Sequence, residues 1–294
     1  MVEATTNSSQ NILLKEIKSN FVLRKIFSNL KENSLLAIIK YNKKIQNKLN
    51  KNLDDYKNYR KTIIEIIPEE NKYGNFINKL GKEIHIYFND EKKEIDRNYL
   101  KKGDNIKKIK ILIDENIKSF EGLFKSCECI KIVNFIRFNR KDIINMSEMF
   151  RKCTSLRELN HFNCNNNILT GMYSMFSGCT SLKKLNMEDL NVNSVTDMSY
   201  MFNECISIEE ININNFCANS ITDMSYMFYN CKSLKKLNLP SIKLNTNSEI
   251  DMTCLLDRCS SLKELNCSDE QIKRWFNYSK QSYKYFLIAK YLLI

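Results

Sequence analysis

Six cysteines at a nearly constant spacing are the residues of this chain whose type and pattern most suggest chemistry. They follow one another in four steps of 26 residues and one of 28: Cys127, Cys153, Cys179, Cys205, Cys231 and Cys259. Such a column could bind a metal or undergo a redox change. However, a zinc site needs convergent ligands, and a disulfide needs Cβ atoms about 3.5–4.5 Å apart. Because stacked strands would hold these thiols in a line at about 4.8 Å, we predict a structural column with no metal and no cofactor.

The cysteines belong to a sequence repeat. Units of 26 residues align without a gap from Met146, Met172, Met198 and Met224, a fifth begins at Met252, and a degenerate one precedes them. Starting at Met146, apolar residues stand at i, i+3, i+4 and i+7, which predicts a short helix ending at Cys153. An Asn, Gly or Asp before the first Met suits the N-cap of that helix. A Leu-x-x-Leu-x-apolar segment follows and predicts a short, half-buried strand.

One such unit is too small to bury its own apolar face, but stacked neighbours bury it for one another. We therefore predict an α/β solenoid, a curved stack similar to leucine-rich repeats with a parallel sheet on one face. Six units are expected to occupy residues 117–267. Residues 61–116 contain strand-like segments at 63–68, 83–88 and 109–113, and we predict that they bridge to the solenoid and cap it, with 109–113 as its first edge. Residues 268–294 are predicted to form a helical C-terminal cap.

Two columns of charged residues on the predicted strands form the candidate partner-binding face. The residue before the second Leu alternates in sign from unit to unit: Glu158, Lys184, Glu210, Lys236 and Glu264. The preceding residues complete the face: Arg157, Lys183, Glu209, Lys235 and Lys263. Alternating signs favour in-register pairing, so these columns either fix the register alone or also bind a protein. A neighbouring column of asparagines, beginning with Asn134 and Asn160, predicts a side-chain hydrogen-bond ladder.

Residues 1–60 differ from the repeats. They hold 12 Lys and Arg against five acidic residues and show short helical apolar patterns, which predicts a small basic helical module. The segment from Phe21 to Ile45 is similar to an F-box, with its apolar stripe at Leu23, Ile26, Phe27 and Leu30. That resemblance implies docking on a Skp-type linker of a cullin ubiquitin ligase. A plain helical cap on the solenoid is the alternative.

A second resemblance covers about residues 117–267. The pattern M-S-x-M-F-x-x-C-x-S-L-x-x-L-N, followed by N-x-x-S-V-T-D-M at Asn191–Met198, resembles the BspA-like leucine-rich repeat of the mycoplasma-lipoprotein type. Members of that family form curved solenoids and act mainly in adhesion and protein binding. The resemblance therefore implies a repeat protein that binds other proteins.

Composition limits the remaining function classes. The chain has 294 residues, of which 43% are apolar, and a net charge of +12. With two His, no Gly-rich phosphate loop and no Ser–His–Asp group, we expect no enzyme. The first residues are polar and no run of 18 apolar residues occurs, so we expect a cytoplasmic monomer without a transmembrane segment.

Three function classes remain open from the sequence. The first is an intracellular protein-binding scaffold, in its more specific form a substrate adaptor of a cullin-type ubiquitin ligase. The second is a cell-surface adhesion or host-interaction protein. The third is a nucleic-acid binder that would use Lys40, Lys43, Lys44, Lys48 and Lys51. Few aromatic residues interleave these lysines and no known module is visible, so no specific nucleic acid is predicted.

Overall fold

The computed structural model describes residues 42–49, 61–138, 140–162, 168–187, 192–213, 220–239, 250–274 and 276–278. The chain divides into two compact units, Met1–Lys61 and Thr62–Ile294. In the described part of the first unit, helix α4 spans Lys43–Leu49. The rest of the predicted helical module, including the F-box-like residues Leu23, Ile26, Phe27 and Leu30, lies outside the described residues.

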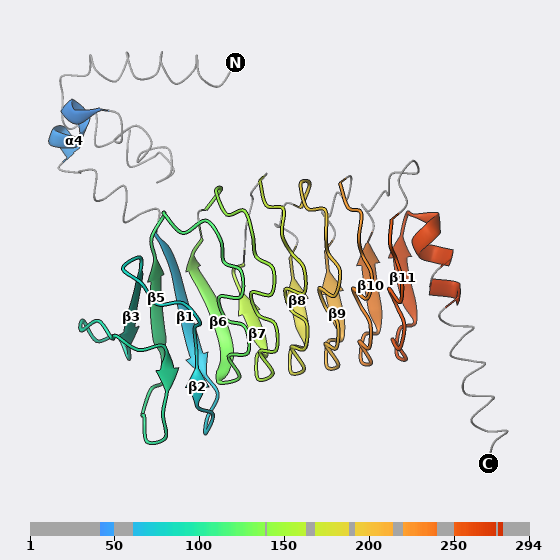
Figure 1. Cartoon of the computed structure of the whole chain (residues 1–294), viewed down its shortest axis with the longest axis horizontal. Helices are drawn as coiled ribbons and strands as arrows, with labels where there is room; N and C mark the ends of the chain where they lie inside the picture. The colour runs from blue at the N-terminus through green and yellow to red at the C-terminus, as the bar shows by residue number, and fades with distance from the viewer. Residues whose placement is uncertain are drawn as a thin grey trace. The chain divides into compact units, whose positions relative to one another are not determined.

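The second unit is a mostly-β solenoid whose short strands lie side by side in a row (Figure 1). In its described part, successive repeats contribute β6 (Ile130–Arg137), β7 (Glu158–Asn160), β8 (Lys184–Asn186), β9 (Glu210–Asn212), β10 (Lys236–Leu239) and β11 (Glu264–Cys267). Neighbouring strands pair in parallel, except that the ladder is interrupted between β7 and β8. There the chain leaves β7 through His161, which has a left-handed φ of 56°. The predicted parallel sheet is confirmed.

A second line of parallel bridges joins the repeats before their strands. The bridges connect, in order, Ser119, Asn145, Gly171, Asp197, Asp223 and Asp251. We number coils 1 to 6 from these residues. The two lines of contact hold equivalent residues of successive coils next to each other, so each sequence column becomes a row in space.

The segment predicted as a short helix is instead a ladder of turns. The Phe124 N–H donates to the Met149 carbonyl of the next coil at 2.9 Å, whereas the Met149 N–H donates to Met146, three residues back, at 3.2 Å. Two residues of this coil, Glu148 and Lys152, have left-handed φ angles of 57° and 59°, which an α-helix excludes. The helix prediction is therefore wrong, and the fold is mostly β rather than α/β. Two successive turns direct residues i, i+3, i+4 and i+7 into the core, as a helix would. The apolar spacing in the sequence therefore cannot distinguish the two structures.

The residue before the first Met caps these turns through its side chain. Asn145 Oδ1 accepts a hydrogen bond from the Ser147 N–H, two residues along, at 2.8 Å. The aspartates at this position make the same contact in coils 4, 5 and 6. Coil 3 has Gly171 here, where a Cβ would collide with Asn145 Oδ1. The sequence thus identified capping residues, although they cap turns and not a helix.

The core consists of matching rows of apolar side chains from successive coils. Five phenylalanines are fully buried and stack in order: Phe124, Phe150, Phe176, Phe202 and Phe228. Their ring centroids are 5.3, 5.5, 5.7 and 5.5 Å apart. Each buried ring contributes roughly 1.5–3 kcal/mol through removal from water. Because every ring packs on the next coil, this stabilisation requires stacking.

Antiparallel strands cover the first coil. The sheet order is β3 (Ile84–Phe88), β5 (Ile109–Ile113), β1 (Thr62–Pro68), β6 and β7. The prediction that 109–113 forms the first edge of the solenoid is therefore wrong, because β1 lies between β5 and β6. The seven residues of β1 match the eight of β6 and cover an edge that would otherwise expose unpaired backbone groups. A small pair, β2 (Gly74–Asn75) and β4 (Tyr99–Leu100), completes this end.

At the other end of the solenoid, residues 270–274 and 276–278 are helical. Ile272 is fully buried and Phe276 packs against the core. The predicted helical cap at 268–294 starts with these residues. Its remainder lies outside the described part of the chain.

Candidate binding faces of the solenoid

Five of the six cysteines of the column, from Cys127 to Cys231, lie fully buried in the core, and Cys259 is partly exposed. From coil 2 onward, each thiol lies 2.9–3.1 Å from the carbonyl oxygen of the core phenylalanine in the preceding coil, as Cys153 does from Phe124, and donates to it. Burial raises the pKa of Cys205 to about 12 and also raises the pKa of Cys153 above its ordinary value. Protonated, hydrogen-bonded thiols are poor nucleophiles and poor metal ligands.

The structure offers no other evident metal centre in the residues it describes. No group of three or more His, Cys, Asp or Glu side chains within them is arranged to hold a metal ion. The nine cysteines that are described are all free. Because most thiols of the column are buried and hydrogen-bonded, the exposed surfaces of the coils are the candidate binding sites.

The predicted partner-binding residues form one exposed face, which we call the strand face. It comprises Arg157, Glu158, Lys183, Lys184, Glu209, Glu210, Lys235, Lys236, Lys263 and Glu264. Nine are exposed and Glu209 is half-buried. The inward neighbour is buried in β8, β9 and β10, as Leu185 and Leu237 are, and partly buried in β7 and β11. The alternation along each strand thus separates a charged exterior from the apolar core.

Part of the strand face neutralises itself. Lys236 pairs in register with both Glu210 and Glu264, and its Nζ lies 3.6 Å from a Glu264 carboxylate oxygen. Lys235 Nζ lies 2.6 Å from Glu209, and the hydrogen bond from Lys235 lowers the pKa of Glu209. These contacts agree with the predicted role of alternating charge in fixing the register.

The asparagine column makes at least one of its predicted contacts. Asn160 Nδ2 donates to Asn134 Oδ1 at 2.9 Å, between coils 2 and 1. Asn134 Nδ2 in turn lies 3.4 Å from Glu65 of β1. The first step of the ladder therefore continues into the antiparallel strands that cover coil 1.

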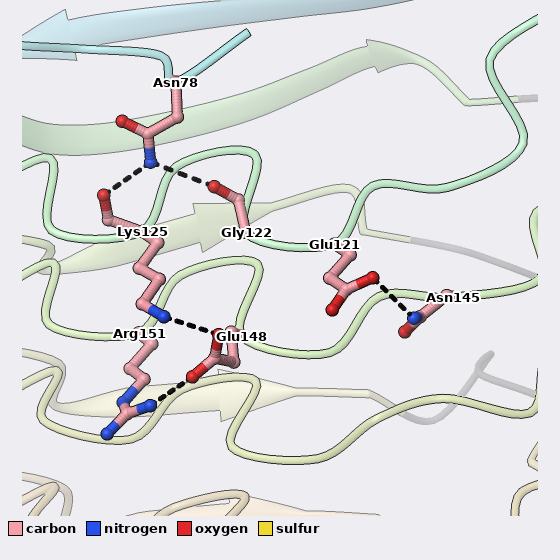
Figure 2. A network of polar contacts seen from close by, with 7 residues as sticks. All are labelled: Asn78, Glu121, Gly122, Lys125, Asn145, Glu148 and Arg151. Carbon is pink, nitrogen blue, oxygen red and sulfur yellow. Dashed lines mark hydrogen bonds and ion pairs between the residues drawn. The ribbon is translucent and has the colours of Figure 1, made fainter.

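The turn ladder forms a second face, the turn face, which comprises residues 119–127, 145–153, 171–179, 197–205, 223–231 and 251–259. In coils 1 and 2 its polar side chains satisfy one another (Figure 2). Lys125 Nζ lies 2.6 Å from Glu148, which also pairs with Arg151. Burial opposes ionisation of Glu148, but the hydrogen bonds from Lys125 and Arg151 outweigh it, so the pKa of Glu148 is lowered. Asn78 Nδ2 closes the network by donating to the carbonyls of Gly122 and Lys125 at 2.9 and 2.6 Å.

In coils 3 to 5 the turn face carries a row of tyrosines. Tyr200 and Tyr226 stack with their centroids 4.8 Å apart, Tyr173 meets Tyr200 edge-on at 6.0 Å, and Tyr229 lies 5.4 Å from Tyr226. All four tyrosines are half-buried. This row was not predicted from the sequence. Its signal was the recurrence of Met-Ser-Tyr-Met at residues 198–201 and 224–227, which placed equivalent tyrosines on adjacent coils.

The repeat region of this chain matches one protein-family model. The family model described as "Mycoplasma protein of unknown function, DUF285" matches residues 104–184 and 144–275, which together cover more than half of the chain. The chain belongs to the DUF285 family. No curated protein and no solved structure gives a significant match.

Membership in DUF285 agrees with the predicted BspA-like repeat and places it on the described solenoid. The matched residues include both binding faces and exclude residues 1–60, so the F-box resemblance remains a prediction. In the described part of this DUF285 chain, no helix has the length and apolar character needed to cross a bilayer.

Proposed function

We propose that this DUF285 protein is a non-catalytic scaffold that binds a protein partner through its strand face. The observation that supports this function most is the row of exposed charged side chains held at strand spacing over the apolar core. The parallel ladder already fixes the backbone of the strand face. Binding of a partner would therefore cost little main-chain entropy in this protein. We further propose that the chain acts as a cytoplasmic monomer.

Charge on the strand face is only partly used within the molecule. The face carries six basic and four acidic residues. Lys183, Lys184, Glu158 and Glu210 form no ion pair with any residue that the structure describes. Lys184 stands opposite Glu210 in register, but no ion pair closes between them, so these side chains remain available to a partner. They are suited to a partner surface of complementary mixed charge, because rim charges of this kind favour association and specificity.

The test uses the full chain with two charge-reversal pairs. Lys183→Glu with Lys184→Glu changes the strand face, and Lys101→Glu with Lys102→Glu changes two exposed lysines elsewhere. Quantitative affinity purification with mass spectrometry should recover a partner with the parent chain and the control but not with the strand-face pair. Equal recovery by all three chains would contradict the proposal.

A more specific proposal is that the scaffold is a substrate adaptor of a cullin-type ubiquitin ligase. It is supported by the resemblance of residues 21–45 to an F-box. Co-purification of a Skp-type linker with the full chain, and its loss on Phe27→Ala, is the expected result. Absence of the linker from the complex purified with the parent chain would contradict the adaptor proposal.

The competing function is adhesion or host interaction at the cell surface, supported by the BspA-like repeat. Fractionation of the native protein distinguishes the two. A surface pool accessible to added protease supports adhesion, whereas a purely cytosolic pool supports the intracellular scaffold.

A further inference from the structure

The turn face of coils 3 to 6 differs in charge from the rest of this basic protein. Its turns carry five acidic residues and one basic residue: Asp197, Glu204, Asp223, Asp251, Asp257 and Arg258. The turns of coils 1 and 2 carry two acidic and three basic residues, and the whole chain has a net charge of +12. An acidic surface on a cationic protein attracts cations and repels polyanions, and salt screens this attraction.

The same turns provide an aromatic platform. The row of Tyr173, Tyr200, Tyr226 and Tyr229 runs across coils 3, 4 and 5 with each ring in contact with the next. Each ring is partly exposed, so aromatic surface remains open to a ligand. Tyrosine is enriched at interfaces because it combines an apolar ring with a polar hydroxyl and has few torsions to order on binding.

One contact within the molecule already places a basic side chain over a ring of this row. The Arg258 guanidinium lies 5.4 Å from the centroid of the Tyr229 ring, within the range of cation–π attraction. The aspartates cap their own turns, and none of the five carboxylates forms an ion pair with a described Lys or Arg. Aromatic rings and carboxylates that no described Lys or Arg neutralises therefore occur along the same row of turns.

We propose that this tyrosine–acid face, made of the four tyrosines and five carboxylates above, docks an extended lysine- and arginine-rich segment of a partner protein. Basic side chains would lie over the rings and beside the carboxylates, as Arg258 lies over Tyr229. Four coils at about 4.8 Å span roughly 14 Å, which four or five residues of extended peptide would cover. The face shares no residue with the strand face, so the inference extends beyond the proposed function.

The test measures binding of a fluorescein-labelled peptide of about ten residues, made of Arg, Lys and Ser, to the full chain by fluorescence polarisation. Tyr200→Leu with Tyr226→Leu should weaken binding about tenfold, whereas Tyr200→Phe with Tyr226→Phe should retain it because the rings remain. Asp223→Asn with Asp251→Asn should weaken binding and reduce its salt dependence. Asn is expected to preserve the turn, because Asn145 caps the equivalent turn in coil 2.

Controls separate this inference from the strand-face function. The Lys183→Glu, Lys184→Glu chain should bind the peptide no more weakly than the parent, whatever its effect on the other partner. Equal affinity for a peptide of Glu and Ser, or equal binding by the Tyr→Leu chain with a native circular dichroism spectrum, would overturn the proposal. A dimer of the parent chain that the Tyr→Leu pair dissociates would assign the face to a second copy and would also overturn it.

Discussion

The two ends of the turn face have one backbone but opposite surfaces. Glu148 in coil 2 lies between Lys125 and Arg151, whereas Glu204 in coil 4 is exposed and has no ion-pair partner among the described residues. The hydrogen bonds from each turn to the next coil are equivalent at both ends. The repeat therefore determines the backbone and the core, while the outward positions vary from coil to coil. Binding is expected where those positions leave charge and aromatic surface unsatisfied.

Phenylalanine truncation tests whether the two ends have the same core. Phe150→Ala and Phe202→Ala should each lower the free energy of unfolding by about 3–5 kcal/mol, because each removes a fully buried ring that stacks on both sides. Urea denaturation followed by circular dichroism measures both. A much smaller loss for Phe202→Ala would show that the cores differ, and the comparison of surfaces would then lose its basis.

Removal of one carboxylate at each end tests the difference in surface. Glu148→Gln should cost about 1–2 kcal/mol, because Lys125 and Arg151 lose a partly buried partner. Glu204→Gln should change stability by less than about 0.5 kcal/mol. Denaturation at neutral pH and low salt measures both variants.

The pH dependence of stability tests the Glu148 network in a second way. The pKa of Glu148 is lowered in the folded chain, so its contribution is present above its ordinary pKa of about 4.3 and is lost as pH falls through the lowered value. The stability difference between the parent and Glu148→Gln should therefore shrink as pH falls below about 4. A difference that grows with acidity would contradict the network.

A glycine in the turn ladder distinguishes turns from the helix that the sequence predicted. Gly178 has φ of 73°, and an added Cβ would meet no atom closer than 3.4 Å. Gly178→Ala should therefore destabilise the fold by about 1 kcal/mol through backbone strain alone, whereas in a helix it would stabilise by a similar amount. Lys152→Gly, at the equivalent position with φ of 59°, should have the opposite sign. Thermal denaturation of the two variants measures the signs.

This position explains how far the sequence could predict the fold. The 26-residue period identified the stack, the parallel sheet and the columns, because only stacking buries the apolar faces. The same period could not distinguish a helix from paired turns, since Met146, Met149 and Phe150 face inward in either. That choice depends on hydrogen bonds between coils, such as Phe124 to Met149, which have no separate signature in one unit.

The candidate surfaces were predictable to different degrees. The strand face was predictable because charged and apolar residues alternate in each unit next to the repeated Leu and Asn positions. All the predicted residues lie on this face. The tyrosine row did not, because Tyr173 stands one position earlier in its unit than Tyr200 and Tyr226 do in theirs. Their contact depends on side-chain reach between coils, and the order β3-β5-β1-β6 likewise depends on pairing that local patterns do not encode.

The smallest change in stability is expected on the strand face, where it tests whether the alternating charges stabilise the strand register. Lys236→Glu places a third carboxylate between Glu210 and Glu264, which stand opposite it in register, and should destabilise by roughly 0.5–1 kcal/mol at low salt. Adding Glu264→Lys should restore much of the loss because it recreates an alternating pair. Denaturation of the two single variants and the double variant at two salt concentrations measures the coupling. No coupling at low salt would mean that alternation does not fix the register, and the whole charged face would then be free for a partner.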